Sequence, residues 1–136
     1  MENRNGLLVD FRVDIMNGRL EREAALEMLD DSLERHRRVT LAADKNYDVK
    51  AFVAQLRERG IVPHVTQHIT NHRGSAIDGR TTRHEGYSIS QRVRRRIEEI
   101  FGWLKTTGGL RRSRFRGVEK TRMAAELAAT AYNLLR

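Results

Sequence analysis

The sequence predicts an α/β sandwich built as one domain. Its first half alternates short apolar runs, typical of strands, with stretches of helical periodicity, and its last third is helical. A length of 136 residues suffices for one hydrophobic core. No internal repeat and no Pro/Ser-rich linker divides the chain. The predicted order is strand, helix, strand, helix, strand, and then helices.

The first strand is predicted from an alternation that begins at Val9. Apolar and charged side chains take turns as far as Asp14, so one face of this strand is expected to be buried. An Asn-Gly pair at 17–18 predicts a turn. Residues 21–36 then carry acids in their first turn and apolar side chains at helical spacing. We expect a helix there, with an inner face made of Ala25, Met28, Leu29 and Leu33.

The middle of the chain predicts two further strands separated by a helix. Residues 39–44 are a short apolar run, typical of a buried strand that ends at an aspartate. Asp48 is the expected N-cap of the next helix, and Gly60 is its expected end. The inner face of that helix is expected to contain Phe52, Val53 and Leu56. Residues 61–65 are the third strand, near a sheet edge because their proline cannot donate a hydrogen bond.

The remainder of the chain predicts a loop followed by two helices. Residues 67–90 are polar and rich in His, Arg, Gly, Ser and Thr, which indicates a long loop. A helix is expected from Ser90 to Lys105 and is broken at Gly108-Gly109. A basic connector then leads to a last helix over residues 119–135.

The positive charge is concentrated in the C-terminal half. Residues 1–72 hold 11 Lys/Arg and 12 Asp/Glu, a net charge of −1, whereas residues 73–136 hold 15 and 6, a net charge of +9. Such asymmetry favours a surface for a polyanion, most simply nucleic acid, over an ordinary solvated surface. The candidate DNA-contacting residues are Arg92, Arg94, Arg95, Arg96, Arg111, Arg112, Arg114 and Arg116.

Composition excludes several other classes of protein. There is no cysteine, so disulfides and thiolate metal sites are excluded, and this fits a reducing cytoplasm. No secretion signal is visible at the N-terminus, and no run of about 18 apolar residues predicts a membrane span. A cytoplasmic protein without a membrane partner is therefore expected.

Glu98 and Glu99 lie inside the most arginine-rich segment, and helical geometry separates them. At roughly 100° per residue, one face collects Val93, Ile97, Ile100, Phe101 and Leu104 and is expected to face the core. Glu99 falls opposite that face, in solvent. Glu98 falls on its shoulder together with Arg94 and Lys105. The simplest interpretation is an Arg94–Glu98 salt bridge along the helix; the chemical one is a carboxylate that serves an active site.

Asp44 is the second candidate carboxylate, because it ends an apolar strand. Ligands of open α/β sheets collect beyond strand ends, although a plain turn would also use the aspartate of "DKNYD". Together with Glu98, it suggests a magnesium site for phosphoryl transfer. Mg²⁺ prefers hard oxygen ligands and usually takes one or two protein carboxylates.

Several segments together resemble the C-terminal part of bacterial insertion-sequence transposases of the DDE type. The segments are "LAADKNYD", "FVAQLRERGIVPHV", "RGSAIDGRTTRH", "SQRVRRRIEEIFGWLKTTGGLRRSRFRG" and "AATAYNLLR", and they occur in matching order over nearly the whole chain. The resemblance implies a ribonuclease-H-like sandwich with a mixed sheet flanked by helices. The whole chain would be one portion of that catalytic domain, with a sheet and helix core at 1–66, a loop at 67–90 and helices at 91–136.

The resemblance also implies site residues and partners. Asp44 corresponds to the second and Glu98 to the third of three acids that bind two divalent metals, Mg²⁺ or Mn²⁺. Arg94, Glu98 and Lys105 match the family's Arg-x3-Glu-x6-Lys pattern, while Gln91 stands where the broader signature has Tyr. DNA, as transposon ends and target, is the implied partner, in the nucleoid of a bacterium.

The first strands and the first catalytic Asp of the family lie upstream of the segment that resembles "MENRNGLLVD". The expectation is therefore a fragment that is inactive by itself. The alternative is a non-catalytic DNA-binding or regulatory remnant that associates with full-length transposase or with itself. Removal of strands would also expose sheet edges, which favours self-association.

Overall fold

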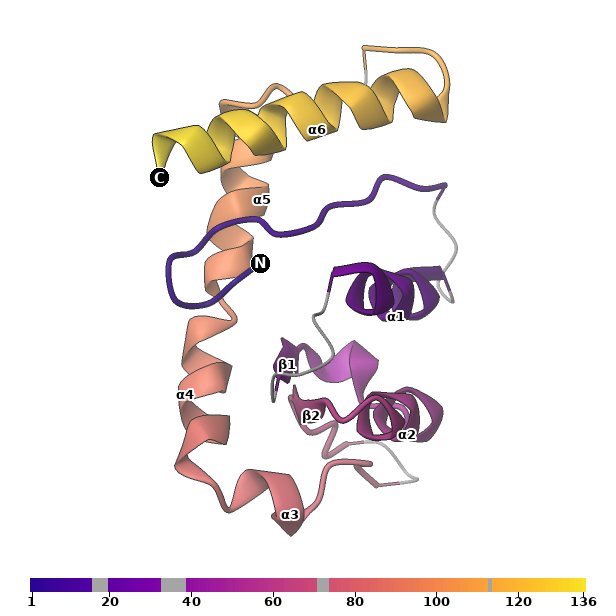
Figure 1. The fold of residues 1–136 in the computed structure, drawn as a ribbon, viewed down its shortest axis with the longest axis vertical. Coiled ribbons are helices and arrows are strands. Elements are labelled where there is room, and N and C mark those ends of the chain that lie inside the picture. The colour runs from indigo at the N-terminus through magenta and orange to yellow at the C-terminus, as the bar shows by residue number, and fades with distance from the viewer. Residues whose placement is uncertain (16–19, 33–38, 71–73, 113) are drawn as a thin grey trace. The chain divides into compact units, whose positions relative to one another are not determined.

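A computed structural model describes most of the chain (Figure 1). The described residues are 1–15, 20–32, 39–70, 74–112 and 114–136. Contacts gather the chain into two compact units, one made of residues 1–32 with 95–136 and the other of residues 33–94. Each unit has buried apolar side chains of its own.

The unit of residues 33–94 contains a parallel pair of strands. Strand β1 (Thr40–Ala43) pairs with β2 (Val62–Val65), and Thr40 lies opposite Val62 in the register. The second and third predicted strands are thus confirmed. Their burial differs: the last three residues of β2 are buried, whereas β1 is only half-buried and its first residue is exposed. Within the described residues the sheet has these two strands alone, so the mixed sheet expected from the resemblance is not seen there.

Helix α2 (Lys50–Glu58) makes the crossover that joins the two parallel strands. Its predicted inner face is confirmed, since Phe52, Val53 and Leu56 are buried. The helix ends near Gly60, whose φ of 72° suits a residue without a Cβ and whose N–H donates to Arg57 O. The predicted N-cap was wrong. Val49 occupies that position without a side-chain hydrogen bond.

Asp48 instead holds the segment that follows β2. The carboxylate is buried, and it accepts from His68 N at 2.7 Å and from Ala76 N at 2.9 Å. Ile77, the next residue, is fully buried. The backbone N–H groups of His68 and Ala76 are therefore satisfied by a protein carboxylate instead of water, which holds both residues against Asp48.

The predicted loop over residues 67–90 was consequently too long. Its second part forms two helices, α3 (Gly79–Thr82) and α4 (Glu85–Val93). Asp78 caps α3, because its Oδ1 accepts from Arg80 N at 3.0 Å. The segment is polar because its helices expose much of their surface. In α4, for example, Ser90 is the one buried side chain.

The other unit, residues 1–32 with 95–136, is helical. Its helices are α1 (Leu20–Ser32), α5 (Arg96–Thr106) and α6 (Val118–Leu135). The core of this unit is formed by Ile100, Leu104 and Tyr132. The first and last predicted helices are confirmed over these bounds; the predicted turn at 17–18 and positions 33–36 of the first predicted helix lie outside the described residues.

The glycine break after α5 is confirmed. Gly109 has a φ of 70°, and Leu110 N donates to Leu104 O at 3.0 Å as the chain leaves the helix. A Cβ on Gly108 would lie 2.8 Å from that same carbonyl oxygen, so only glycine fits there without a shift of the backbone.

The first predicted strand was wrong. Residues 6–15 have no strand partner, and Val9, which was expected to point inward, is 60% exposed. Leu8 and Phe11 instead pack as part of an irregular segment against the core of α5 and α6. The alternation holds at Phe11 and Val13, which are half-buried, and fails at Val9, because Leu8 from the other side of the predicted strand packs instead. It could not indicate that the neighbour would be a helix pair rather than a strand.

The helix predicted from Ser90 to Lys105 is two helices. Helix α4 ends at Val93, and α5 begins at Arg96. Arg94 and Arg95 keep helical dihedral angles, but the ladder of hydrogen bonds is interrupted there, and Glu98 N donates to Arg95 O. The inner face predicted for the single helix is confirmed at Ile100 and Leu104 and partly at Ile97, but not at Phe101, which is 45% exposed.

Candidate active site

Asp44 directly follows β1 and is exposed. Its Oδ1 accepts from Asn46 N at 2.8 Å, which caps the short 3-10 helix Lys45–Tyr47. One carboxylate oxygen of Asp44 therefore forms the turn, as the simpler interpretation of this residue predicted. Among the described residues no partner is found for the other oxygen, Oδ2, which leaves a hard ligand facing solvent at the carboxyl end of a parallel strand.

Glu98 lies in the first turn of α5, where the positive end of the helix dipole stabilises a carboxylate. Glu98 and Glu99 are both exposed, so burial does not separate them. The two glutamates differ in their angle around the helix axis. Lys105, two turns after Glu98, falls within roughly 20° of Glu98 around the axis, whereas Glu99 is rotated from Glu98 by roughly 100°. Glu98 and Lys105 both lie in α5, as the prediction of a shared helix face requires.

Asp44 and Glu98 belong to different compact units. The structure consequently describes the surroundings of each acid by itself. No group of three or more His, Cys, Asp or Glu side chains suited to a metal ion occurs in the part of the chain that the structure describes. Each of the two exposed carboxylates is by itself a hard oxygen donor of the type that divalent cations such as Mg²⁺ accept.

Arg94 was expected on the same helix face as Glu98, but it caps α4 instead. Its guanidinium Nε donates to Gln91 Oε1 at 3.1 Å. The helical geometry that aligned Arg94 with Glu98 required one continuous helix, and that requirement is not met. No sequence pattern indicated that Gln91 is the partner of Arg94; Gln91 was noted only as the position where the family pattern is unmet.

His64 lies in β2 and is buried. Its Nδ1 is 2.7 Å from Ser90 Oγ, and the ring of Tyr87 packs edge-on with a centroid distance of 5.8 Å. Burial lowers the pKa of His64, and the nearby His84 lowers it further. The hydroxyl of Tyr87 donates to Val65 O at 3.0 Å. These contacts join α4 to β2, and the lowered pKa favours the neutral form of the His64 ring at pH 7.

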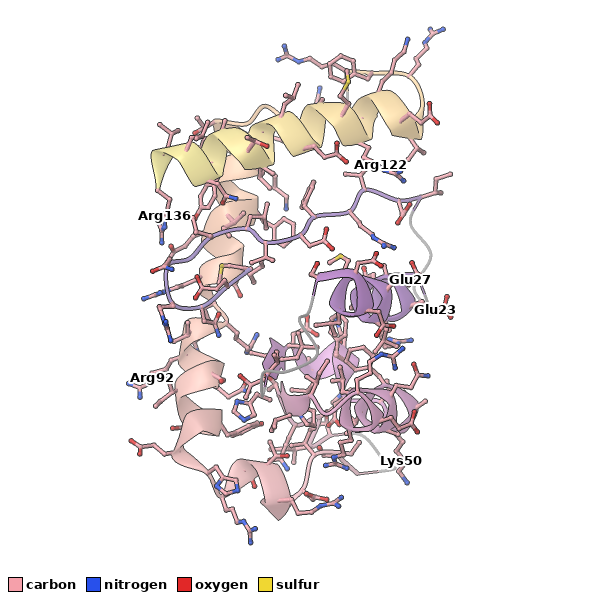
Figure 2. All side chains as sticks on the ribbon, viewed as in Figure 1. Glu23, Glu27, Lys50, Arg92, Arg122 and Arg136 are labelled. Carbon is pink, nitrogen blue, oxygen red and sulfur yellow. The ribbon has the colours of Figure 1, made fainter. Side chains whose placement is uncertain are left out.

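The candidate DNA-contacting arginines of the connector between α5 and α6 are exposed. These are Arg111, Arg112, Arg114 and Arg116, and the structure pairs none of them with a carboxylate of the described residues. Arg92, Arg95 and Arg96 are exposed as well, and Arg96 Nη1 donates to Asn3 O at 3.0 Å. Arg92 extends outward from α4 (Figure 2). Exposed cations that no carboxylate neutralises are the type of group that contacts phosphates.

The family model described as "Transposase DDE domain" matches residues 1–134. The chain belongs to the DDE transposase family. This membership implies an enzyme that cleaves and transfers DNA, a ribonuclease-H-like fold and DNA as partner. No significant match was found among curated proteins or among solved structures.

In this transposase domain, the described elements agree with the family at the level of fold class. The parallel strands β1 and β2 with the crossover helix α2 are an α/β arrangement, and helices follow them in the chain. None of the helices in the described ranges combines the length and the apolarity that a membrane span needs. DDE transposases in general use divalent metal ions, which agrees with the carboxylates singled out above.

Proposed function

We propose that residues 1–136 supply the second and third acids and the DNA-binding surface of a DDE transposase. The reaction is the cleavage of a DNA phosphodiester and the transfer of the strand to target DNA. The observation that carries this proposal is Asp44: an exposed carboxylate with one oxygen unused, directly after a parallel strand, in a chain that matches the transposase domain over residues 1–134.

The roles of the residues follow from their chemistry. Asp44 and Glu98 would hold a divalent cation, Mg²⁺ or Mn²⁺, through carboxylate oxygens. When bound, such an ion activates the attacking hydroxyl and stabilises charge on the phosphate. Lys105, on the same face of α5 as Glu98, would hold the DNA backbone close to that carboxylate. Arg94 would bind a phosphate at the carboxyl end of β1.

The basic connector would bind DNA without reading its sequence. Residues 73–136 carry a net charge of +9, and the four arginines of the connector are exposed. Each phosphate contact releases condensed counterions, so the affinity is expected to fall steeply with salt. Residues 1–72, with a net charge of −1, are expected to contribute little to this salt-dependent affinity for DNA.

We further propose that a polypeptide of these 136 residues binds DNA but does not cleave it. It contains the matches to the second and third acids, whereas two-metal phosphoryl transfer requires a clamp on both ions. The alternative function is non-catalytic, namely DNA binding and regulation through association with full-length transposase or with a second copy. The half-buried strand β1 favours this alternative, because within the described sheet it has a neighbour on one side only.

One paired experiment tests the proposal. Labelled transposon-end DNA is incubated with the purified chain in Mg²⁺ or Mn²⁺ and assayed for binding over a salt series and for nicking or joining. Salt-sensitive binding without nicking is expected. Metal-dependent strand transfer that is lost in Asp44→Ala would contradict the proposal that this chain does not cleave DNA. Failure to bind DNA at low salt would contradict its proposed DNA-binding role. Light scattering with and without a full-length transposase tests the alternative.

Variants of the connector sharpen the binding test. Changing Arg111 and Arg112 to Gln is expected to weaken binding for all sequences and to reduce the salt slope by about 1.8, at about 0.9 per phosphate contact. The matched control changes Arg4 and Lys50 to Gln. It removes the same charge from exposed positions of the acidic half, and its slope should stay near that of the unchanged chain.

A further inference from the structure

Thr66 ties the end of β2 to the end of β1. Its backbone N–H donates to Ala43 O at 3.0 Å, and Ala43 is the last residue of β1, immediately before Asp44. The Thr66 hydroxyl lies 2.6 Å from Gln91 Oε1 and 3.2 Å from Ala43 O. A hydroxyl has one proton to donate, so the shorter contact, to Gln91, is the main one.

Gln91 on α4 has its side-chain amide fixed by three hydrogen bonds. Its Nε2 donates to His64 O at 2.7 Å, while its Oε1 accepts from the Thr66 hydroxyl and from Arg94 Nε. The orientation of the amide follows from its partners, because His64 O can only accept and Arg94 Nε can only donate. Gln91 is partly buried, which strengthens these hydrogen bonds.

Arg94 is therefore held through Nε, one turn of helix after Gln91. The structure gives its two Nη groups no protein partner in the described ranges, and the side chain is partly buried. A guanidinium held at Nε keeps its plane fixed and presents both Nη groups to a ligand. Planar, bidentate donors of this kind suit the oxygens of a phosphate. Arg92, on the same helix, is exposed, and no side chain of the described residues holds its guanidinium in this way.

We propose that Gln91 and Thr66 are positioning residues, which hold Arg94 so that its Nη groups bind a DNA phosphate at the strand end that carries Asp44. This inference rests on the proposed function for its ligand. The tether itself involves protein groups alone: Ala43 and Thr66 at the strand ends, and Gln91 and Arg94 on α4.

The first test observes Arg94 in the protein without DNA. Nuclear magnetic resonance relaxation of the Arg94 Nε–H group is expected to show a rigid side chain in the unchanged chain, and a mobile one in Gln91→Ala and in Thr66→Val. Thr66→Ser, which keeps the hydroxyl, should preserve the rigidity. The Nε–H of Arg92 is the internal control and should be mobile throughout. An Arg94 Nε–H that stays rigid in both Gln91→Ala and Thr66→Val overturns the proposal.

The second test measures binding to end DNA over a salt series. Arg94→Met is expected to weaken binding about tenfold, the usual scale of one charge-assisted hydrogen bond, and to lower the salt slope by about 0.9. Gln91→Ala should reproduce much of this loss although it changes no charge. In the double variant the two losses should not add, because both act through one guanidinium. A merely structural role would give additive losses and an unchanged slope, which overturns positioning.

Two features keep the outcomes distinct. Thr66→Val conserves volume and leaves the backbone N–H of residue 66 in place, so the effect of the hydroxyl is measured even where Gln91→Ala disturbs folding. If the unchanged chain binds no DNA at low salt, the proposed function fails. The relaxation experiment on the protein alone then still decides whether Gln91 and Thr66 hold Arg94.

Discussion

Asn133 forms two hydrogen bonds with the backbone of Leu8. Its side-chain oxygen accepts from Leu8 N at 2.9 Å, and its side-chain nitrogen donates to Leu8 O at 2.8 Å. The side-chain amide of Asn133 thereby makes the two hydrogen bonds with Leu8 that a neighbouring strand would make in a sheet. Because the backbone polar groups of Leu8 are satisfied in this way, the N-terminal segment can cover the apolar side of α5 and α6 without joining a sheet.

Asn133→Ala is expected to detach this segment. The change leaves the N–H and C=O of Leu8 partly buried without partners, which costs about 1–3 kcal/mol of unfolding free energy. Hydrogen exchange of the Leu8 amide should accelerate, and the urea midpoint should fall. Asn3→Ala, at an exposed position, is the matched control and should change neither quantity. A slow Leu8 amide in Asn133→Ala would contradict the role assigned to this pair.

The two aspartates around the 3-10 helix allow a second prediction. Asp48→Asn replaces one accepting oxygen with an NH₂ group that faces a backbone N–H, at His68 or at Ala76. We expect a loss of about 1–3 kcal/mol and faster exchange of both amides. Asp44→Asn should cost less than about 1 kcal/mol, since an exposed cap can keep its accepting oxygen. Equal costs would show that the buried carboxylate does not hold this segment.

The buried His64 predicts a pH dependence of stability. Burial lowers its pKa below the value of about 6.5 expected in the unfolded chain. As the pH falls below about 6.5, His64 is protonated in the unfolded state but stays neutral in the folded state. The unfolding free energy therefore decreases. The slope is at most about 1.4 kcal/mol per pH unit, and it ends below the folded pKa.

Urea unfolding at pH 7.5, 6.5 and 5.5 measures this effect. His64→Gln is expected to flatten the decrease between pH 6.5 and 5.5. The carboxyl of Asp78, whose pKa is lowered by its hydrogen bond from Arg80, loses its stabilising contribution only below about pH 3.8 and does not interfere. An equally steep decrease in His64→Gln would assign the titration to another group.

The two neighbouring glutamates of α5 should differ in catalysis. The test protein joins residues 1–136 to the upstream part of a related DDE transposase, which supplies the first Asp. Glu98→Gln is expected to abolish cleavage of end DNA and to leave binding unchanged or tighter, because a metal-binding carboxylate and one negative charge are lost. Glu99→Gln, rotated by roughly 100° on α5, should keep most of the activity. Similar behaviour of both variants would contradict the metal role of Glu98.

The sequence predicted best those elements whose signal is local. The inner face of α2, the strands around it and the glycine break after α5 follow from side-chain spacing and from backbone preferences within a few residues. The position of Asp44 at a strand end followed from the same local pattern. Concentrated positive charge and matched segments indicated a transposase, which the family match confirms.

Tertiary contacts decided the rest. Whether the alternating N-terminal segment became a strand depended on a side chain 125 residues away, Asn133. The positions of His68 and Ala76 depended on the buried carboxylate of Asp48. Likewise, the partner of Arg94 could not be predicted from a helical wheel, because the hydrogen-bond ladder breaks before α5 and Thr66 helps to fix Gln91 from another element. Periodicity reports which side of a segment is apolar; which distant polar group completes its backbone and side-chain hydrogen bonds is determined only when the chain has folded.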